Sequence, residues 1–299
     1  MEVVLETAAL CKRYGKFEVL RSLTMSVPRG AIYGLVGKNG AGKSTLLRLI
    51  CGLQAPTDGS YRLYGTDAYD RAIGKARAHM GAVVETPALY LDMSAADNLR
   101  EQALALGLPD GGDIPSLLSL VGLGKKRVRH FSLGMRQRLG IAVALLGNPD
   151  FLILDEPLNG LDPQGILEMR ELILTLNRER GITVLVSSHI LDELSKIATH
   201  FGFIDEGHIV READAETLRK SFRKYTALRV DDVRACAVAL DRLGLSYEVA
   251  GENEVLLFSD ITLTRLVEAL SAQSCELLTA TRRDESLETY FLDLVGGNN

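Results

Sequence analysis

The fold of this chain is decided by the stretch Gly37-Lys38-Asn39-Gly40-Ala41-Gly42-Lys43-Ser44-Thr45. It directly follows Ala31–Val36, an almost entirely apolar run that is typical of a β-strand covered on both faces. From Lys43 to Cys51 the apolar residues recur at helical spacing. A buried strand, a glycine-rich loop and a helix in this order predict a loop that cradles phosphates.

The residue types in this loop have physical roles. Glycines let the backbone wrap closely around a phosphate and turn several N–H groups inward. The helix that follows directs free N–H groups and the positive end of its dipole at the anion. Lys43 adds a point charge for the β- and γ-phosphates, and the Ser44 hydroxyl is placed to ligate Mg²⁺. The predicted nucleotide-binding residues are Gly37, Lys38, Asn39, Gly40, Ala41, Gly42, Lys43, Ser44 and Thr45.

Two carboxylates, Asp155 and Glu156, end a second apolar run, Phe151–Leu154. Ligands of open α/β sheets bind at the carboxyl ends of the strands. We therefore expect Asp155 to hold Mg²⁺, directly or through water, and Glu156 to act as the general base on the attacking water. His189 follows a third apolar strand and is placed to contact a γ-phosphate, although a lone histidine is equally consistent with a surface or core position.

Composition and charge exclude several classes of protein. The chain has 299 residues, of which 46% are apolar, so it is long enough for one large domain or two of unequal size. Its net charge of −5 gives no electrostatic case for nucleic acid, which calls for a basic surface. No apolar run reaches the ~18 residues of a membrane span. The N-terminus lacks the pattern of a signal peptide.

The cysteines favour a reducing compartment. Cys11, Cys51, Cys236 and Cys275 are scattered and form no CxxC pair, so we expect small buried residues rather than disulfides or metal ligands. The protein is therefore expected to be cytosolic, with membrane contact only through a partner.

Strands and helices alternate through residues 1–220, which predicts an α/β domain with a largely parallel core sheet. Residues 2–27 are expected to form strands with turns, and residues 86–147 to be mostly helical. Asp58-Gly59 is predicted as a hairpin turn.

A second, smaller domain is predicted for residues 221–299. It begins at the polar and basic segment Ser221–Tyr225, a candidate linker. The order βαββαβ that follows predicts a ferredoxin-like α+β module, and a last helix is expected from Ser286.

The stretch Phe131-Ser132-Leu133-Gly134-Met135-Arg136-Gln137-Arg138 resembles the signature of the ABC transporter ATPase family. That signature is normally Leu-Ser-Gly-Gly-Gln. Here Ser132 and Gly134 are kept, whereas Leu133 and Met135 replace the first glycine and the glutamine. This form is known in the bacitracin and lantibiotic export branch of the family.

The resemblance implies a P-loop NTPase fold of ABC ATPase type, with a mixed core sheet, an antiparallel β subdomain and a helical subdomain. It also implies binding and hydrolysis of ATP with Mg²⁺. Tyr14 matches the aromatic residue that stacks on adenine, although it is also consistent with simple packing. Asn159–Asp162 resembles the D-loop, and His189 matches the switch histidine. Ser132 and Gly134 would offer a hydroxyl and an N–H to a γ-phosphate.

One departure from the family pattern lies in the segment Met80–Pro87. The family usually has a glutamine there, in the Q-loop, that reaches Mg²⁺ and the water, and Glu85 takes its place. The same substitution is known in lantibiotic-immunity ATPases. The resemblance therefore predicts Glu85 as a ligand of Mg²⁺, with a salt-bridged surface glutamate as the alternative.

Partners follow from the same resemblance. It implies a head-to-tail dimer, expected to be a homodimer, with ATP between the Gly37–Thr45 loop of one copy and Ser132–Met135 of the other. A separate transmembrane permease would dock near Glu85–Asp97 and export an antimicrobial peptide or a drug. The chain would then lie in the cytoplasm, on the inner face of the cell membrane. The segment Leu287–Leu292 also fits this branch.

Three alternatives stand beside this interpretation. A soluble ABC ATPase acting on nucleic acid would carry a coiled-coil insertion or a second cassette, and the sequence shows neither. A regulatory partner that binds ATP without turnover would not need Lys43, Asp155, Glu156 and His189 together. Another P-loop enzyme, such as a small kinase, would not explain Ser132–Gln137.

Overall fold

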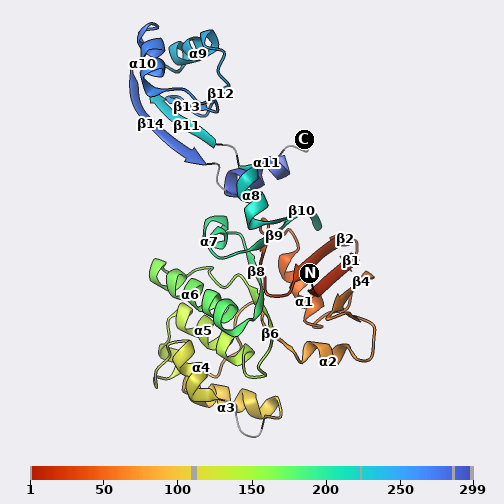
Figure 1. Ribbon diagram of the computed structural model, residues 1–299. Helices are drawn as coiled ribbons and strands as arrows, with labels where there is room; N and C mark the ends of the chain where they lie inside the picture. Colours follow the sequence, from red (N-terminus) through yellow and green to blue (C-terminus); the bar gives the residue numbers. More distant parts are fainter. Residues whose placement is uncertain (1, 109–112, 223, 285–286, 297–299) are drawn as a thin grey trace. The chain divides into compact units, whose positions relative to one another are not determined.

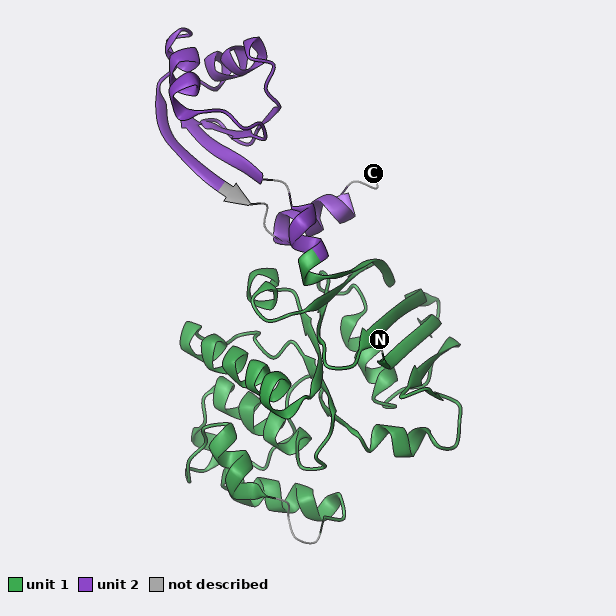
Figure 2. Cartoon of the chain, viewed as in Figure 1, with its two compact units in different colours: residues 1–216 green, residues 217–299 purple. Residues whose placement is uncertain are grey.

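A computed structural model describes residues 2–108, 113–222, 224–284 and 287–296 (Figure 1). The chain divides into two compact units, residues 1–216 and residues 217–299 (Figure 2). The sequence predicts this boundary between residues 220 and 221. Arg223, in the middle of the candidate linker, lies outside the described residues; α8 (Ala215–Ser221) ends before it and β11 (Lys224–Val230) begins after it.

The first unit is built around a six-stranded sheet with the strand order β10-β9-β3-β8-β7-β6. Neighbouring strands are parallel except β10, which pairs antiparallel with β9. This is the predicted mixed sheet with a parallel core. The strands are β3 (Ile32–Val36), β6 (Met80–Val83), β7 (Phe151–Asp155), β8 (Thr183–Ser188), β9 (His200–Asp205) and β10 (His208–Asp214).

Burial confirms which strands are covered on both faces. Every residue of β3, β7 and β8 is buried, as their continuous apolar sequences predict. Strand β6 was not predicted, because its short sequence contains Gly81. A side chain at residue 81 would place its Cβ 3.0 Å from the Ala144 carbonyl carbon, so the packing requires glycine. Because glycine is not typical of strands, the sequence does not predict a strand there.

An antiparallel sheet with the order β2-β1-β4-β5 forms the β subdomain. Its strands are β1 (Val3–Tyr14), β2 (Phe17–Pro28), β4 (Asp58–Leu63) and β5 (Thr66–Asp67). The prediction of a hairpin turn at Asp58-Gly59 was wrong, because both residues lie in β4. Gly59 instead faces a bulge of β1, where a Cβ would lie 2.6 Å from the Ala9 carbonyl carbon. The turn is formed by Tyr64 and Gly65, both with positive φ.

Helices cover the core sheet and fill the region 86–147, as predicted. Side-chain caps fix where four of them begin: Ser94, Asp113, Ser132 and Asp162 each accept a hydrogen bond from the N–H three residues later. The helices of this unit are α1 (Lys43–Ile50), α2 (Ile73–Arg77), α3 (Ala95–Ala105), α4 (Ile114–Leu120), α5 (Leu133–Ala144), α6 (Pro163–Arg180) and α7 (Leu191–Ser195), with a 3-10 turn at Val128–His130.

The second unit has the predicted βαββαβ order. Its sheet is antiparallel with the strand order β12-β13-β11-β14, the arrangement of a ferredoxin-like module. Leu228, Leu240 and Leu270 are among the residues of a hydrophobic core confined to this unit. The elements after β11 are α9 (Val233–Arg242), β12 (Tyr247–Val249), β13 (Glu254–Leu257), α10 (Leu263–Ser271), β14 (Leu277–Asp284) and α11 (Leu287–Gly296). Ser286, the predicted start of the last helix, lies outside the described residues.

The cysteines are all free thiols. Cys236 and Cys275 are buried, whereas Cys11 and Cys51 are partly buried. Burial raises the pKa of the Cys51 and Cys236 thiols to about 12.

Within the ranges that the structure describes, no helix is both long enough and apolar enough to cross a membrane.

Gly202 in β9 is expected to tolerate no side chain. A Cβ there would lie 2.8 Å from Cζ of Tyr33, a buried ring whose hydroxyl donates to Glu212 at 2.7 Å. We expect Gly202→Ala to destabilise the first unit by about 1–3 kcal/mol. Urea unfolding followed by far-UV circular dichroism measures this. Gly74→Ala in α2, where a Cβ would meet no atom within 4 Å, is the control; equal midpoints for the two variants would contradict the prediction.

Candidate functional site

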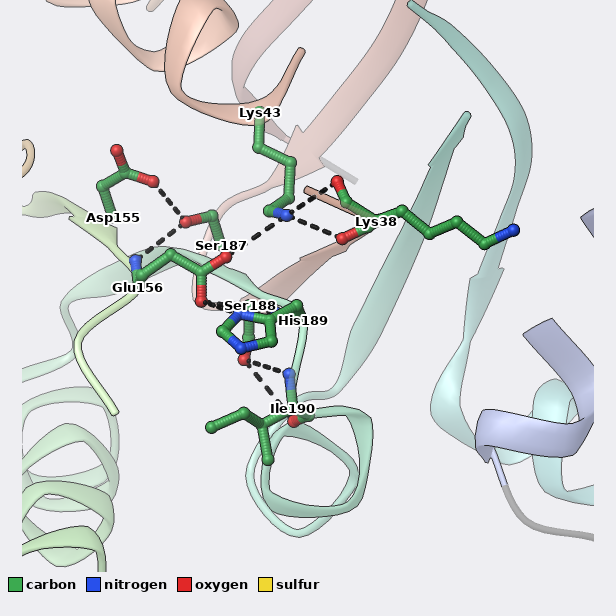
Figure 3. Close-up of polar contacts among 9 residues, drawn as sticks. Lys38, Lys43, Asp155, Glu156, Ser187, Ser188, His189 and Ile190 are labelled. Atoms are coloured by element: carbon green, nitrogen blue, oxygen red, sulfur yellow. Dashed lines mark hydrogen bonds and ion pairs between the residues drawn. The ribbon is translucent and has the colours of Figure 1, made fainter. Parts of the chain in front are cut away.

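Three adjacent strands bring the glycine-rich loop, the two carboxylates Asp155 and Glu156, and His189 to one edge of the core sheet. Strands β3, β8 and β7 are parallel neighbours, with Val36 opposite Ser188 and Asp155 opposite Ser187. The glycine-rich loop leaves β3, His189 follows β8, and the carboxylates end β7. Figure 3 shows their side chains converging.

The loop forms part of the wall of a cavity of about 300 Å³. Of the predicted loop residues, all but Gly37 and Ala41 line it. A side chain at Gly37 would place its Cβ 2.5 Å from the Ile204 carbonyl oxygen, so Gly37 permits close packing beneath the loop. The lining residues are Phe17, Val19, Lys38, Asn39, Gly40, Gly42, Lys43, Ser44, Thr45, Glu156 and Asn159.

Lys43 holds a buried positive charge at this cavity. Its side chain is only 6% exposed. The ammonium donates to the carbonyl of Gly37 at 2.6 Å and to that of Lys38 at 3.3 Å, and it forms an ion pair with Glu156 Oε1 at 3.2 Å. The ammonium of Lys38, by contrast, points away from this cluster (Figure 3). The buried ammonium of Lys43 therefore fits its predicted role as the loop's charge for a phosphate, and that role stays a prediction.

The two carboxylates differ in their surroundings. Asp155 is buried, and its Oδ1 accepts a hydrogen bond from the Ser187 hydroxyl at 2.6 Å. Glu156 has a φ of 50°, a left-handed conformation that turns the chain out of β7. Its Oε2 lies 2.8 Å from His189 Nδ1. Because a carboxylate only accepts, Nδ1 carries the donated proton. Glu156 is thus held between His189 and Lys43.

Oxygen donors for Mg²⁺ are present in Ser44 and Asp155. The Ser44 hydroxyl lies on the cavity wall and has no hydrogen-bond partner among the described residues. Mg²⁺ commonly takes one or two protein oxygens and completes its shell with water and substrate phosphates, so these donors fit it. In the described ranges no group of three or more His, Cys, Asp or Glu side chains is arranged to hold a metal.

Glu85 is a salt-bridged surface glutamate in this structure, which is the alternative to its predicted role as a ligand of Mg²⁺. Its carboxylate forms an ion pair with Arg48 of α1, and its backbone has a φ of 64°. It does not line the phosphate cavity. Ligation of Mg²⁺ by Glu85 stays a prediction, and it would require the ion pair with Arg48 to open.

Aromatic residues at the cavity include one that sequence reasoning missed. Phe17, at the start of β2, is 67% exposed and lines the cavity. Tyr14, opposite it across the turn, does not line the cavity; its hydroxyl donates to Gln54, and Lys12 Nζ lies 5.2 Å from its ring centroid. Stacking of Tyr14 on a base stays a prediction. No sequence pattern marks Phe17, because its place at the cavity depends on the pairing of β1 with β2.

The signature residues lie away from this cavity. Ser132 caps α5 by accepting from the N–H of Met135 at 3.3 Å, and Gly134 is in the first turn of that helix. Neither lines the cavity. Leu161 lies beside Gly134, at 3.6 Å from the position of an added Cβ, whereas Asn159 lines the cavity. The segment Asn159–Asp162 therefore runs from the phosphate cavity to the signature.

Fold and site together define an ATPase of the P-loop class. The family model described as ABC transporter matches residues 20–159. The bacitracin transport ATP-binding protein BcrA of Enterococcus faecalis is 38% identical over 99% of this chain and 98% of its own length. The lantibiotic transport ATP-binding protein SrtF of Streptococcus pyogenes is 44% identical over 73% of this chain and 96% of its own length.

A solved structure agrees with these relatives. That of cbiO1 from Clostridium perfringens, part of the ABC transporter complex cbiONQ, has a TM-score of 0.66 and 26% identity. The match covers 82% of this chain and 98% of cbiO1. The chain belongs to the family of ABC transporter ATP-binding proteins, and it is an ATPase whose hydrolysis of ATP drives transport.

Replacing Glu156 by glutamine is expected to stop hydrolysis without loss of ATP binding. The amide keeps the size of the side chain but cannot take a proton from water, so kcat should fall by roughly 10²–10⁴. The measurements are steady-state ATPase rate and ATP retained through gel filtration.

The matched control is Glu168→Gln. Glu168 lies on α6, where it pairs with Arg138 at 3.0 Å, away from the cavity. Glu168→Gln should hydrolyse ATP at nearly the wild-type rate. A Glu156→Gln protein with wild-type turnover would remove Glu156 from the role of base.

Proposed function

We propose that two copies of this chain pair head to tail around two ATP molecules and drive a separate membrane permease that exports an antimicrobial peptide or a drug. The observation that carries the dimer is the separation of two half-sites within one chain. Lys43 and Glu156 line the cavity, and His189 is joined to Glu156 beside it, whereas no residue of α5 lines the cavity.

The second half-site is the N-terminus of α5. Free N–H groups and the positive end of the helix dipole favour an anion there. Ser132 is exposed at this helix start, and Gly134 leaves the backbone accessible. A γ-phosphate bound to the Gly37–Thr45 loop of one copy would meet these groups of the other. ATP would then join the two copies, and its hydrolysis would release them.

In the reaction, this chain's residues bind the phosphates and move a proton. Lys43 pairs with the phosphate oxygens, exchanging its contact with Glu156 for them. Glu156 accepts the proton of the attacking water, while the proton on Nδ1 of His189 keeps its carboxylate oriented. Mg²⁺, held by Ser44 and Asp155, would supply positive charge against the phosphate oxygens.

A groove beside the Q-loop segment supports docking of a permease. It has a volume of about 260 Å³, and most of its lining residues are apolar. Tyr90 and Leu91, 53% and 50% exposed, lie within the adjoining segment Glu85–Asp97. The groove is lined by Ala82, Val83, Val84, Thr86, Pro87, Ala88, Leu89, Gln102, Gly140 and Val143. An apolar surface of this kind suits a short helix from the cytoplasmic side of a membrane subunit.

The relatives support the export branch. The matched BcrA is named for bacitracin transport and spans almost the whole chain, so the match includes the second unit. The matched SrtF is named for lantibiotic transport. Both names concern peptide antibiotics, as does the branch to which Ser132–Met135 and Glu85 pointed.

The head-to-tail arrangement predicts that two inactive variants complement each other. Lys43→Ala disables the loop. Gly134→Asp sets a negative charge against the phosphate, while an acidic residue in the first turn of α5 keeps that helix stable. In a mixed dimer one site combines an intact loop with an intact signature, so an equal mixture should recover up to about a quarter of wild-type ATPase activity.

Each variant alone is the control, and ATP-dependent dimers are measured by light scattering. A mixture that forms dimers but stays inactive would contradict the shared site.

The permease is expected to accompany the tagged chain through detergent solubilisation of membranes. We expect a polytopic membrane protein to co-purify, identified by mass spectrometry. Leu91→Arg should abolish its capture, because it places a charge on the apolar docking surface. Leu53→Arg, at a leucine that is 66% exposed elsewhere, is the control. Absence of any membrane protein with the wild-type chain would favour a soluble role instead.

A further inference from the structure

Ser187 is hydrogen-bonded to both acidic residues of the site, to the carboxylate of Asp155 and to the backbone N–H of Glu156. It is opposite Asp155 in the parallel pairing of β7 and β8, and it is fully buried. Its hydroxyl donates to Asp155 Oδ1 at 2.6 Å, and the N–H of Glu156 donates to the same hydroxyl at 2.9 Å (Figure 3). An N–H only donates and a carboxylate only accepts, so the single proton of this hydroxyl must point to Asp155 and its oxygen must accept from Glu156.

The Ser187 hydroxyl stabilises an unusual backbone conformation at Glu156. A non-glycine residue at φ 50° costs about 1–3 kcal/mol and persists only where its surroundings fix it. The N–H of Glu156 reaches both the hydroxyl of Ser187 and its carbonyl oxygen, the latter at 3.2 Å. These bonds define where the chain turns out of β7, and so where the Glu156 carboxylate lies relative to His189.

The same hydroxyl fixes the Asp155 carboxylate. With Oδ1 held by Ser187, rotation of the carboxylate is restricted, and Oδ2 is left for a metal ion or its water. Asp155 is 6% exposed, so bulk water cannot readily replace a lost hydrogen bond. Removal of this hydroxyl would loosen both carboxylates at once.

We propose that Ser187 is a positioning residue for ATP hydrolysis, which sets the rate of the chemical step through Asp155 and Glu156 without touching ATP. The proposal rests on the function of the site proposed above. It assigns to Ser187 an effect on kcat and on the Mg²⁺ requirement, and none on the binding of ATP by the Gly37–Thr45 loop.

Thr183 offers a matched control on the same strand. It is also fully buried, and its hydroxyl also accepts a backbone hydrogen bond, from Gly30 at 2.9 Å. It lies at the other end of β8, away from the carboxylates. Thr183→Val therefore measures the structural cost of a lost buried hydroxyl in β8.

The test compares Ser187→Ala and Thr183→Val with the wild-type chain. Misplacement of a catalytic group by about 1 Å costs roughly 10²-fold, so we expect Ser187→Ala to lower kcat about 10- to 100-fold. Its KM for ATP should change less than about threefold, because loss of a transition-state contact alone leaves binding intact. Its half-saturating Mg²⁺ concentration should rise. Thermal unfolding of both variants, followed by circular dichroism, should show similar shifts.

Ser187→Ala with kcat within about threefold of wild type would overturn the proposal, as would an equal loss of kcat in Thr183→Val. If Ser187→Ala fails to fold, Ser187→Cys decides, because its thiol fills the space of the hydroxyl but is a weak donor and acceptor. A wild-type chain that does not hydrolyse ATP would refute the proposed function. Active wild type beside fully active Ser187→Ala and Ser187→Cys would refute the role of Ser187 alone.

Discussion

The parallel register of β3, β8 and β7 is the constraint on which the rest of the site depends. It sets Val36 opposite Ser188 and Asp155 opposite Ser187. Three segments distant in sequence therefore leave the sheet at the same edge and in the same direction. A shift of one residue in the pairing of β7 with β8 would turn Ser187 to the other face of the sheet and separate it from Asp155. Full burial of all three strands enforces the register.

Polar groups at this edge are joined in one continuous network. Asp155 bonds to Ser187, Ser187 to the backbone of Glu156, and the Glu156 carboxylate to both His189 and Lys43. In such a network each group limits the freedom of the next. The positive φ of Glu156 fits this description, because strained backbone is concentrated where function needs a fixed direction. The two carboxylates are therefore held in place by several residues together rather than by one.

Much of the fold could be predicted because strong local patterns agree with the tertiary structure. The apolar runs of β3, β7 and β8 and the βαββαβ order of the second unit are of this kind. Tertiary packing overrode the local signals elsewhere. Gly59 is typical of a turn in sequence, but in the structure it permits the close approach of β4 to β1. Gly81 is not typical of a strand, so β6 was not predicted, and in the structure this glycine allows β6 to pack against α5.

The candidate site shows the same division. The loop residues, Asp155, Glu156 and His189 could be named from sequence, because their chemistry is tied to fixed spacing. Phe17 and Ser187 could not, since their importance depends on which atoms they meet across strands. Glu85 illustrates a further limit: its side chain has a choice of partners, and only the structure shows the ion pair with Arg48.

The two units bury separate hydrophobic cores, one including Leu35 and Phe151 and the other including Leu228 and Leu270. All-or-none unfolding holds for single cooperative cores, and chains with two of them commonly depart from it. The stability of this chain is therefore a pair of quantities, one for each core. A ligand at the phosphate cavity binds the folded first unit and raises the first quantity by mass action. The two transitions of a calorimetric trace would thus be assigned by adding nucleotide.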